Sequence, residues 1–174
     1  MNRILIIGCP GAGKSTFARR LAQITGLPLI HLDCLFWQGE WETVSREEFD
    51  ARLASELSKP YWILDGNYDR TLPLRLSYAD TVFFFDLPTL PCLWGVTERV
   101  FANYGKCRPD MGGHCPERFG KHTRELYRHV LAFRRRHREG YRKLLSEAEG
   151  VTVISFRSRR DADAYLNRLE YRKD

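Results

Sequence analysis

The stretch Gly8-Cys9-Pro10-Gly11-Ala12-Gly13-Lys14-Ser15, followed by Thr16, decides the fold of this chain. It matches the pattern G-x-x-x-x-G-K-[ST], in which glycines let backbone N–H groups turn toward a polyphosphate. The lysine of this pattern places a positive charge on the outer phosphates, and the serine hydroxyl ligates Mg²⁺. We therefore predict that residues 8–16 bind ATP, that Lys14 is catalytic and that Ser15 is a metal ligand.

The residues on both sides of this stretch have the patterns of a strand and a helix. The apolar run at 4–7 is typical of a strand buried in a parallel sheet. Phe17, Leu21 and Ile24 recur at helical spacing, and Gly26 is placed to end that helix. A strand, a glycine loop and a helix N-terminus in this order bind anions. The flanks therefore favour a phosphate site over a chance glycine-rich turn.

The length of 174 residues and the hydrophobic content of 43% indicate one globular domain over residues 1–174. Five scattered cysteines, an odd number, do not suggest a disulfide framework. No apolar run approaches the length of a membrane span, and no leader pattern precedes the first strand. These observations predict a cytoplasmic protein without a membrane partner.

The net charge of +6 is concentrated in one segment. Residues 99–143 contain 13 Lys and Arg against 4 Asp and Glu, so the rest of the chain carries a net charge of −3. Such a segment indicates a local anionic ligand more than a general affinity for nucleic acid. Glycines and prolines interrupt the pattern at 105–120, which predicts a mobile loop that closes over bound phosphates as a lid.

The rest of the sequence alternates between expected strands and expected helices. Apolar runs predict strands at 27–32, 61–64, 82–85 and 151–156. Ser45 and Glu48 form a capping box that opens a helix ending before Pro60. Further helices are expected at 90–104, at 123–145 with a bend near Gly140, and at 161–169. This alternation predicts a parallel α/β sheet with right-handed crossovers.

Three acidic residues follow expected strands directly: Asp33, Asp65 and Asp86. Ligands of open parallel sheets bind at the carboxyl ends of the strands, which brings these acids near the glycine loop. Asp65, followed by Gly66, is the candidate that holds Mg²⁺ through water and faces the substrate. Asp33 is the candidate general base or hydrogen-bond partner of a phosphoryl acceptor. The alternative for each is a helix cap or turn residue, which we favour for Asp86.

Several motifs together resemble a known family. Residues 63–66 resemble the strand-and-turn signature of adenylate kinases. The more specific motifs are His31-Leu32-Asp33, Trp37 with Trp41, Asp65-Gly66-Asn67-Tyr68, and the run Gly105-Lys106-Cys107-Arg108-Pro109-Asp110-Met111-Gly112. From residue 4 to about residue 157 the chain resembles the adenylate-kinase-related DNA topology modulation proteins (FlaR-like). This resemblance implies a P-loop NTPase fold of the nucleoside-monophosphate-kinase type, with a five-stranded parallel sheet ordered 2-3-1-4-5, flanking helices and a lid at about 100–138.

The resemblance also implies roles for arginines, since phosphoryl transfer depends on positioning and on charge stabilisation. Arg99 corresponds to a lid arginine that binds the donor phosphates and assists catalysis. Arg108 belongs to the lid motif and is a second catalytic candidate. Arg70 resembles an acceptor-binding arginine, one residue further along than in adenylate kinases. Arg134, Arg135, Arg136 and Arg138 cannot all face one side of a helix, so at least two of these four are expected to be solvated.

Two further groups of residues have open assignments. Cys107, His114, Cys115 and His122 lack the paired spacing that zinc ligands usually have, so we do not favour a zinc site. The aromatic residues Trp37, Trp41, Tyr68 and Tyr104 are candidates either for an acceptor pocket or for ordinary core.

We expect an ATP- and Mg²⁺-dependent phosphotransferase that acts on a small acceptor, a nucleoside monophosphate or a similar metabolite. One alternative is an ATP-binding regulator of DNA topology that binds nucleic acid, although the sequence contains no nucleic-acid-binding motif. Another is a small-molecule kinase of the sugar or shikimate type, because Asp33 would suit a hydroxyl acceptor equally well. The sequence leaves the oligomeric state and the nucleobase preference open.

Overall fold

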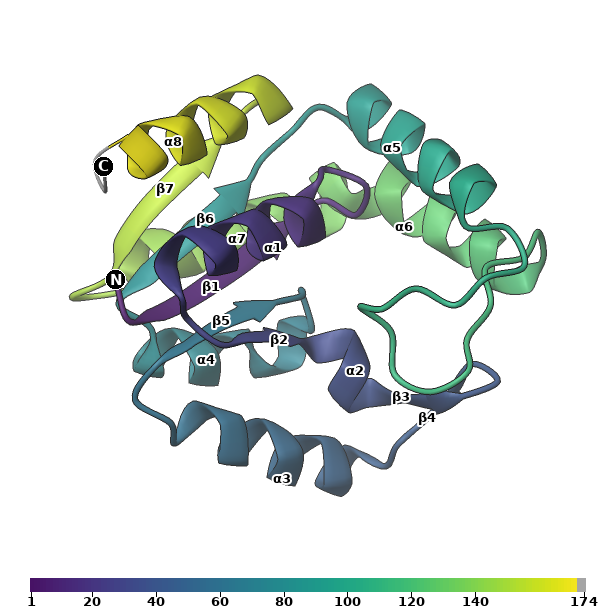
Figure 1. The fold of residues 1–174 in the computed structure, drawn as a ribbon, viewed down its shortest axis with the longest axis horizontal. Coiled ribbons are helices and arrows are strands. Elements are labelled where there is room, and N and C mark those ends of the chain that lie inside the picture. Colours follow the sequence, from purple (N-terminus) through teal and green to yellow (C-terminus); the bar gives the residue numbers. More distant parts are fainter. Residues whose placement is uncertain (172–174) are drawn as a thin grey trace.

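The computed structural model describes residues 1–171, which form a parallel sheet between two layers of helices (Figure 1). Within those residues the sheet contains five strands in the spatial order β2-β5-β1-β6-β7, and each neighbouring pair is parallel. The strands are β1 (Arg3–Gly8), β2 (Leu29–His31), β5 (Trp62–Asp65), β6 (Thr81–Phe85) and β7 (Thr152–Phe156). This confirms the predicted α/β class with a five-stranded parallel sheet flanked by helices.

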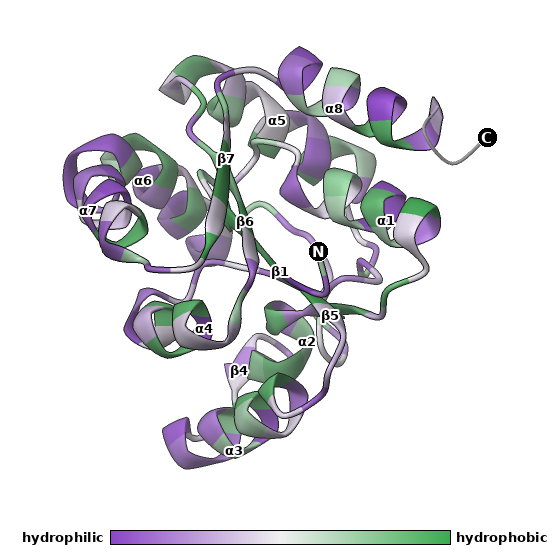
Figure 2. Cartoon of the chain, turned by 90° about the vertical axis from the view of Figure 1, so that its left-hand side faces the viewer, coloured by the Kyte–Doolittle hydropathy of each residue, from purple (hydrophilic) through white to green (hydrophobic). Residues whose placement is uncertain are grey.

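The helices cover both faces of the sheet (Figure 2). One layer contains α1 (Lys14–Thr25) and α8 (Arg159–Tyr171), which pack on each other. The other contains α4 (Leu72–Tyr78), preceded by the short η1 (Asp69–Thr71), together with α6 (Lys121–Arg136) and α7 (Arg138–Glu147). Helix α5 (Thr89–Ala102) packs against α6. Beyond the β2 edge lie α2 (Leu32–Phe36), α3 (Arg46–Leu57) and the antiparallel hairpin of β3 (Trp37–Gly39) and β4 (Glu42–Thr43).

Burial on both faces explains why the strands have continuous apolar sequences. Residues 4–7 of β1 have no exposed surface, and residues 82–85 of β6 are almost as fully buried. Between the sheet and the layer of α1 and α8, the ring of Phe17 lies 4.9 Å from that of Phe83, and Phe83 stacks 5.8 Å from Phe156. This packing fixes the glycine loop that connects β1 to α1 at the edge where the parallel strands end (Figure 1).

Several predicted elements have the expected form. Helix α1 ends at Gly26, whose φ of +76° allows its N–H to reach the carbonyl of Ala22. Ser45 caps α3, because its hydroxyl accepts a hydrogen bond from the N–H of Glu48. Residues 103–120 form a loop with isolated bridges, as the breakers predict. In the part of the chain that is described, no helix is both long and apolar enough to cross a bilayer.

Two boundaries differ from the prediction. The second strand ends at His31 rather than Leu32. Helix α2 begins at Leu32, so Asp33 lies in the first turn of a short helix. The helix expected at 123–145 is broken at His137 rather than near Gly140. His137 and Tyr141 both bind the carboxylate of Asp69 in η1, which anchors the start of α7 to a segment distant in the sequence. The η1–α4 segment and the β3–β4 hairpin were not predicted.

Candidate phosphate and acceptor site

The glycine loop, residues 8–15, needs glycine because of its backbone conformation and its close packing. Gly8, Gly11 and Gly13 have φ values of +134°, +77° and +100°. A Cβ on Gly8 would meet the carbonyl of Phe85, and one on Gly11 would meet the carbonyl of Cys92 in α5. Only glycine satisfies both constraints. The loop is therefore held in one shape by β6 and α5 before any ligand binds.

The backbone N–H groups of the loop fall into two sets. Those of Cys9 and Ala12 donate to the carbonyls of Phe85 (3.2 Å) and Cys9 (3.3 Å), so these two residues shape the loop instead of offering donors to a ligand. The first N–H groups of a helix have no intrahelical partner, and α1 begins at Lys14. Donors for an anion are thus expected at the α1 end, where Lys14, Ser15 and Thr16 line a cavity.

Lys14 bends back across the mouth of the loop. Its Nζ donates hydrogen bonds to the carbonyl of Gly8 (2.9 Å) and to that of Cys9 (3.0 Å). Burial lowers the pKa of Lys14 below its ordinary value, and the negative charge of Asp65 partly offsets that effect. The ammonium group is therefore positioned by the loop itself, at the place where an incoming phosphate would lie.

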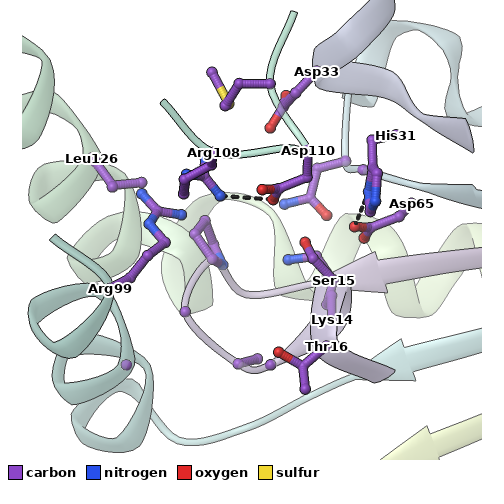
Figure 3. Close-up of a pocket in the computed structure, with 18 of the residues that line it drawn as sticks. Lys14, Ser15, Thr16, His31, Asp33, Asp65, Arg99, Arg108, Asp110 and Leu126 are labelled. Atoms are coloured by element: carbon purple, nitrogen blue, oxygen red, sulfur yellow. Dashed lines mark hydrogen bonds and ion pairs between the residues drawn. The ribbon is translucent and has the colours of Figure 1, made fainter. Parts of the chain in front are cut away.

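Asp65 lies at the end of β5, directly beside His31 at the end of β2 (Figure 3). Its Oδ2 is 2.9 Å from His31 Nδ1, whereas its buried Oδ1 has no hydrogen-bond partner among residues 1–171. Burial alone would raise the pKa of Asp65, but the hydrogen bond to His31 and the charge of Lys14 outweigh it and hold the pKa below its ordinary value. The hydroxyl of Ser15 also contributes to this lowering, so Asp65 is an anion that lies between His31, Lys14 and Ser15.

Asp33 lies across the cavity from the glycine loop, in the first turn of α2. The hydroxyl of Tyr68 donates to its Oδ1 at 2.6 Å. Burial raises the pKa of Asp33 above its ordinary value, and the hydrogen bond from Tyr68 and the charge of Arg108 only partly oppose that effect. A half-buried carboxylate with a raised pKa has the properties of a general base.

Arg75, which sequence analysis did not single out, holds the turn that carries Tyr68. It is completely buried in α4 and donates to the carbonyls of Gly66 (3.0 Å), Asn67 and Tyr68 (3.1 Å). Burial lowers its pKa to about 10. The Oδ1 of Asn67 in turn accepts a hydrogen bond from the N–H of Gly8 (3.0 Å), so Arg75 connects this turn to the glycine loop.

We predict that Arg75→Leu lowers the free energy of unfolding by about 3 kcal/mol, because it leaves buried carbonyl groups without donors. Urea denaturation monitored by circular dichroism measures the change. Arg52→Leu is the matched control: Arg52 also donates to a carbonyl, that of Leu35, but its side chain is exposed, and we expect a change within about 0.5 kcal/mol. Equal effects of the two substitutions would contradict the role assigned to Arg75.

The side chains of Arg99 and Arg108 lie next to each other in the cavity (Figure 3) and share the carboxylate of Glu117. Glu117 Oε1 lies 3.2 Å from Arg99 Nε and 3.0 Å from Arg108 Nε. Arg108 also donates to Asp110 Oδ2 at 2.7 Å. Burial, with the like charge of Arg108, lowers the pKa of Arg99 below its ordinary value. Glu117 and Asp110, both buried, therefore hold two arginines side by side that would otherwise repel each other.

Arg159, at the start of α8, is a further residue that the sequence did not indicate. Its Nη2 donates to the carbonyl of Gly11 at 2.9 Å, and its buried Nε has no hydrogen-bond partner in the described chain. A Cβ on Gly95 of α5 would meet both this guanidinium and the carbonyl of Gly11. The glycine loop is thus enclosed by α5 and α8, which come from distant parts of the sequence.

Other predicted residues lie away from this site. Arg70 does not line the cavity: its exposed guanidinium pairs with Asp50 at 2.6 and 2.9 Å, so the acceptor-binding position expected from the resemblance is wrong. It lies in the middle of η1 with its side chain directed toward Asp50 of α3. Asp86 accepts hydrogen bonds from Arg138 (2.6 Å) and Arg142 (2.9 Å) and is structural, as favoured.

The cysteines and histidines of the loop are dispersed. Cys107 Sγ lies 3.3 Å from His114 Nδ1, whereas Cys115 is buried and donates to the carbonyl of Gly112. His122 instead packs 3.8 Å from the ring of Trp41. Across residues 1–171, no three His, Cys, Asp or Glu side chains are grouped to hold a metal ion.

Lys14, Asp33, Asp65, Arg99 and Arg108 all line one cavity of about 1060 Å³. The glycine loop and Arg159 line one part of it, and Asp33, the neighbouring Arg108 and a set of aromatic rings line another. These rings are Phe36, Trp37, Trp41 and Tyr68; Phe17 and Phe85 line the cavity as well, while Tyr104 does not. A scan of protein-family models and a search of curated proteins find no match to this chain.

Proposed function

We propose that the protein is a P-loop kinase that transfers the γ-phosphoryl group of ATP to a small acceptor. The observation that carries this proposal is the convergence of Lys14, Asp65 and the Arg99–Arg108 pair on one cavity around the glycine loop. Preorganised cations around a polyphosphate are what phosphoryl transfer requires, because its catalysis consists mostly of positioning and of charge stabilisation.

The residues present also fit Mg²⁺. This ion is commonly held by one or two protein oxygen ligands, substrate phosphates and several waters. Ser15 supplies a hydroxyl beside the expected phosphates, and Asp65, which interacts with that hydroxyl, would hold a metal-bound water. When bound, Mg²⁺ would neutralise charge on the phosphates. Lys14 and Arg99 would stabilise the charge that remains on the transferring group.

The sheet topology supports the same proposal. When only the strands of the main sheet are numbered, their spatial order is 2-3-1-4-5, the order that the resemblance to nucleoside-monophosphate kinases implies. The loop at 103–120 follows α5, after the fourth strand of this sheet, where such kinases have a lid. Ligand binding at the carboxyl ends of the strands is the general rule for open α/β sheets.

Contacts between this loop and the α2–β4 segment favour the role of a lid. The N–H of Gly112 donates to the carbonyl of Asp33 (3.3 Å), and the N–H of Glu40 donates to that of His114 (2.7 Å). Trp41 Nε1 donates to the carbonyl of Pro116 at 3.2 Å. With these contacts the loop covers the cavity, which would exclude water during transfer.

The alternative function, an ATP-binding regulator that binds nucleic acid, is less well supported. Several cations of the basic segment already have partners inside the protein: Arg99 and Arg108 bind Glu117, and Arg138 binds Asp86. Strong electrostatic binding to a duplex would require many unpaired cations on one surface. A steep dependence of duplex binding on salt concentration would favour the regulator.

The proposal is tested by isothermal titration of ATP with Mg²⁺, followed by an assay of ADP formation with candidate acceptors. We expect saturable binding of ATP and ADP formation that depends on the acceptor. Loss of binding on removal of Mg²⁺ would identify the metal-dependent step. A chain that does not bind ATP would not be a kinase.

The lid role predicts that limited trypsin digestion at 105–120 slows when ATP, Mg²⁺ and the acceptor are bound, since the bound phosphates favour the closed loop. The exposed residues Lys106, Arg118 and Lys121 provide the cleavage sites. Arg108 is a poor site because its guanidinium is buried against Glu117. Mass spectrometry of the fragments identifies the cleaved bonds. Protection that is independent of nucleotide would mean that the loop is a fixed part of the domain.

A further inference from the structure

The two ends of the cavity differ in their lining (Figure 3). At the glycine loop, Lys14 and Arg159 donate hydrogen bonds to loop carbonyls. The other end, which we call the acceptor end, contains Asp33, the neighbouring Arg108 and the rings of Phe36, Trp37, Trp41 and Tyr68. The rings of Trp37 and Trp41 lie 5.5 Å apart at nearly a right angle. A ligand bound at the acceptor end would therefore contact aromatic rings and the carboxylate of Asp33.

The segment that forms the acceptor end provides no cation to the cavity. Of the Lys and Arg residues between positions 31 and 70 of the described chain, none lines it. Their side chains have other partners where the structure gives them: Arg52 binds Glu48 and the carbonyl of Leu35, Lys59 binds Glu56, and Arg70 binds Asp50. A phosphate group on the acceptor would therefore lack the arginine or lysine that normally balances its charge.

Arg108 is the cation nearest to Asp33, but its charge is already balanced. It binds the buried carboxylates of Asp110 and Glu117, and Arg99 shares the second of these. Two arginines and two carboxylates form a neutral cluster. Asp33 lies near these arginines but forms no ion pair within residues 1–171, and its negative charge would repel a phosphate dianion.

The chemistry of Asp33 also favours an acceptor that reacts through a hydroxyl group instead of a phosphate group. A phosphate acceptor is already ionised near neutral pH and needs no base. A hydroxyl acceptor has to lose its proton as its oxygen attacks phosphorus, and a carboxylate within hydrogen-bond reach can take that proton. The hydroxyl of Tyr68, 2.6 Å from Asp33 Oδ1, keeps the carboxylate oriented for this role.

We infer that the acceptor is an alcohol without a phosphate group, neutral or cationic, that binds against the aromatic rings and presents its hydroxyl to Asp33. This inference rests on the proposed kinase function and narrows its substrate class away from nucleoside monophosphates. The Asp33 carboxylate takes the hydroxyl proton while the acceptor oxygen bonds to the γ-phosphorus of ATP. The bond between that phosphorus and the β–γ bridging oxygen breaks, ADP leaves, and Asp33 releases the proton to solvent.

The decisive experiment measures the affinity for phosphate-bearing ligands. AMP, GMP, CMP and UMP are each titrated into the enzyme saturated with Mg²⁺ and a non-hydrolysable ATP analogue. We expect dissociation constants weaker than about 1 mM for the wild type and about tenfold tighter binding by Asp33→Asn, which removes the repulsive charge. Asp50→Asn, an exposed neutralisation outside the cavity, is the matched control and should change nothing. Micromolar binding of any monophosphate to the wild type would overturn the inference.

A second measurement compares matched pairs of probes in the ADP-formation assay: choline with phosphocholine, glucose with glucose 6-phosphate, and adenosine with AMP. ADP formation should be faster with the phosphate-free member of a pair. Faster formation with the phosphorylated member would overturn the inference while leaving the kinase function intact. Failure to bind ATP at all would instead overturn both, so the two proposals fail in distinguishable ways.

Discussion

Replacing Lys14 with alanine should slow phosphoryl transfer by about 10²–10³-fold and lower the free energy of unfolding by no more than about 1 kcal/mol. The ammonium group of Lys14 binds the loop carbonyls of Gly8 and Cys9, and it is the cation held closest to the expected phosphates. Its loss removes charge stabilisation from the transition state but removes no apolar packing. Steady-state ADP formation, together with urea denaturation, measures both quantities.

Arg19→Ala is the matched control for this prediction. Arg19 is a cation of the same helix and also lines the cavity, but the hydrogen bond that it donates within residues 1–171 goes to the hydroxyl of Thr16, at 3.4 Å. We expect its removal to change the rate by less than about threefold. If Lys14→Ala retained nearly normal turnover, the glycine loop would not be the phosphate site and the proposed function would fail.

The strands at the centre of the sheet could be predicted because their signal is local. Residues 4–7 and 82–85 are continuous apolar runs, and burial on both faces of a parallel sheet requires such runs. The early end of β2 was harder to predict, because Leu32 continues the apolar pattern. Asp33 in the first turn is favourable for a helix that begins at Leu32, and this competes with extension of the strand.

The break between α6 and α7 could not be predicted from local sequence. Gly140 is the residue with the weakest helix propensity in that segment, yet it lies inside α7. The break occurs at His137 because Asp69 binds His137 and Tyr141, and because Asp86 binds Arg138. Asp69 and Asp86 are more than 50 positions away from the residues of α7 that they bind. Their effect on the helix break therefore becomes visible only in the folded structure.

Some residues of the candidate site could likewise be predicted from the sequence and others could not. Lys14, Asp33 and Asp65 could be found because a motif or a strand end marks each of them. Arg159 acts through a contact with Gly11, far away in sequence, and Glu117 acts through contacts made across the loop, so no pattern marks either residue. Arg75 had a weak signal, since it lies between Leu72 and Leu76 on the buried side of a helix, where an arginine needs partners. Arg70 was misplaced because the resemblance fixes a position in sequence and not the direction of a side chain.

Replacing Asp33 with asparagine should slow transfer to the acceptor by about 10²–10⁴-fold while leaving the affinity for ATP nearly unchanged. Asparagine keeps the size of the side chain and can still accept the hydrogen bond from Tyr68, so the change removes basicity with little change in shape. Titration calorimetry with ATP and single-turnover measurements of transfer separate the two effects. An equal loss of ATP binding would make Asp33 part of the metal site, and an unchanged rate would make it a turn residue.

The pH dependence of the same reaction gives an independent test of the base. Burial raises the pKa of Asp33, and a base acts only when it is deprotonated, so the rate should rise with pH through a midpoint above the ordinary range of an aspartate. Tyr68→Phe removes the hydrogen bond that favours the ionised form, which should move this midpoint to higher pH. In Asp33→Asn the rise should disappear, because no group remains at that position to titrate. A midpoint that stays in place in Tyr68→Phe would assign the titration to another group, and Asp33 would then orient the acceptor without taking its proton.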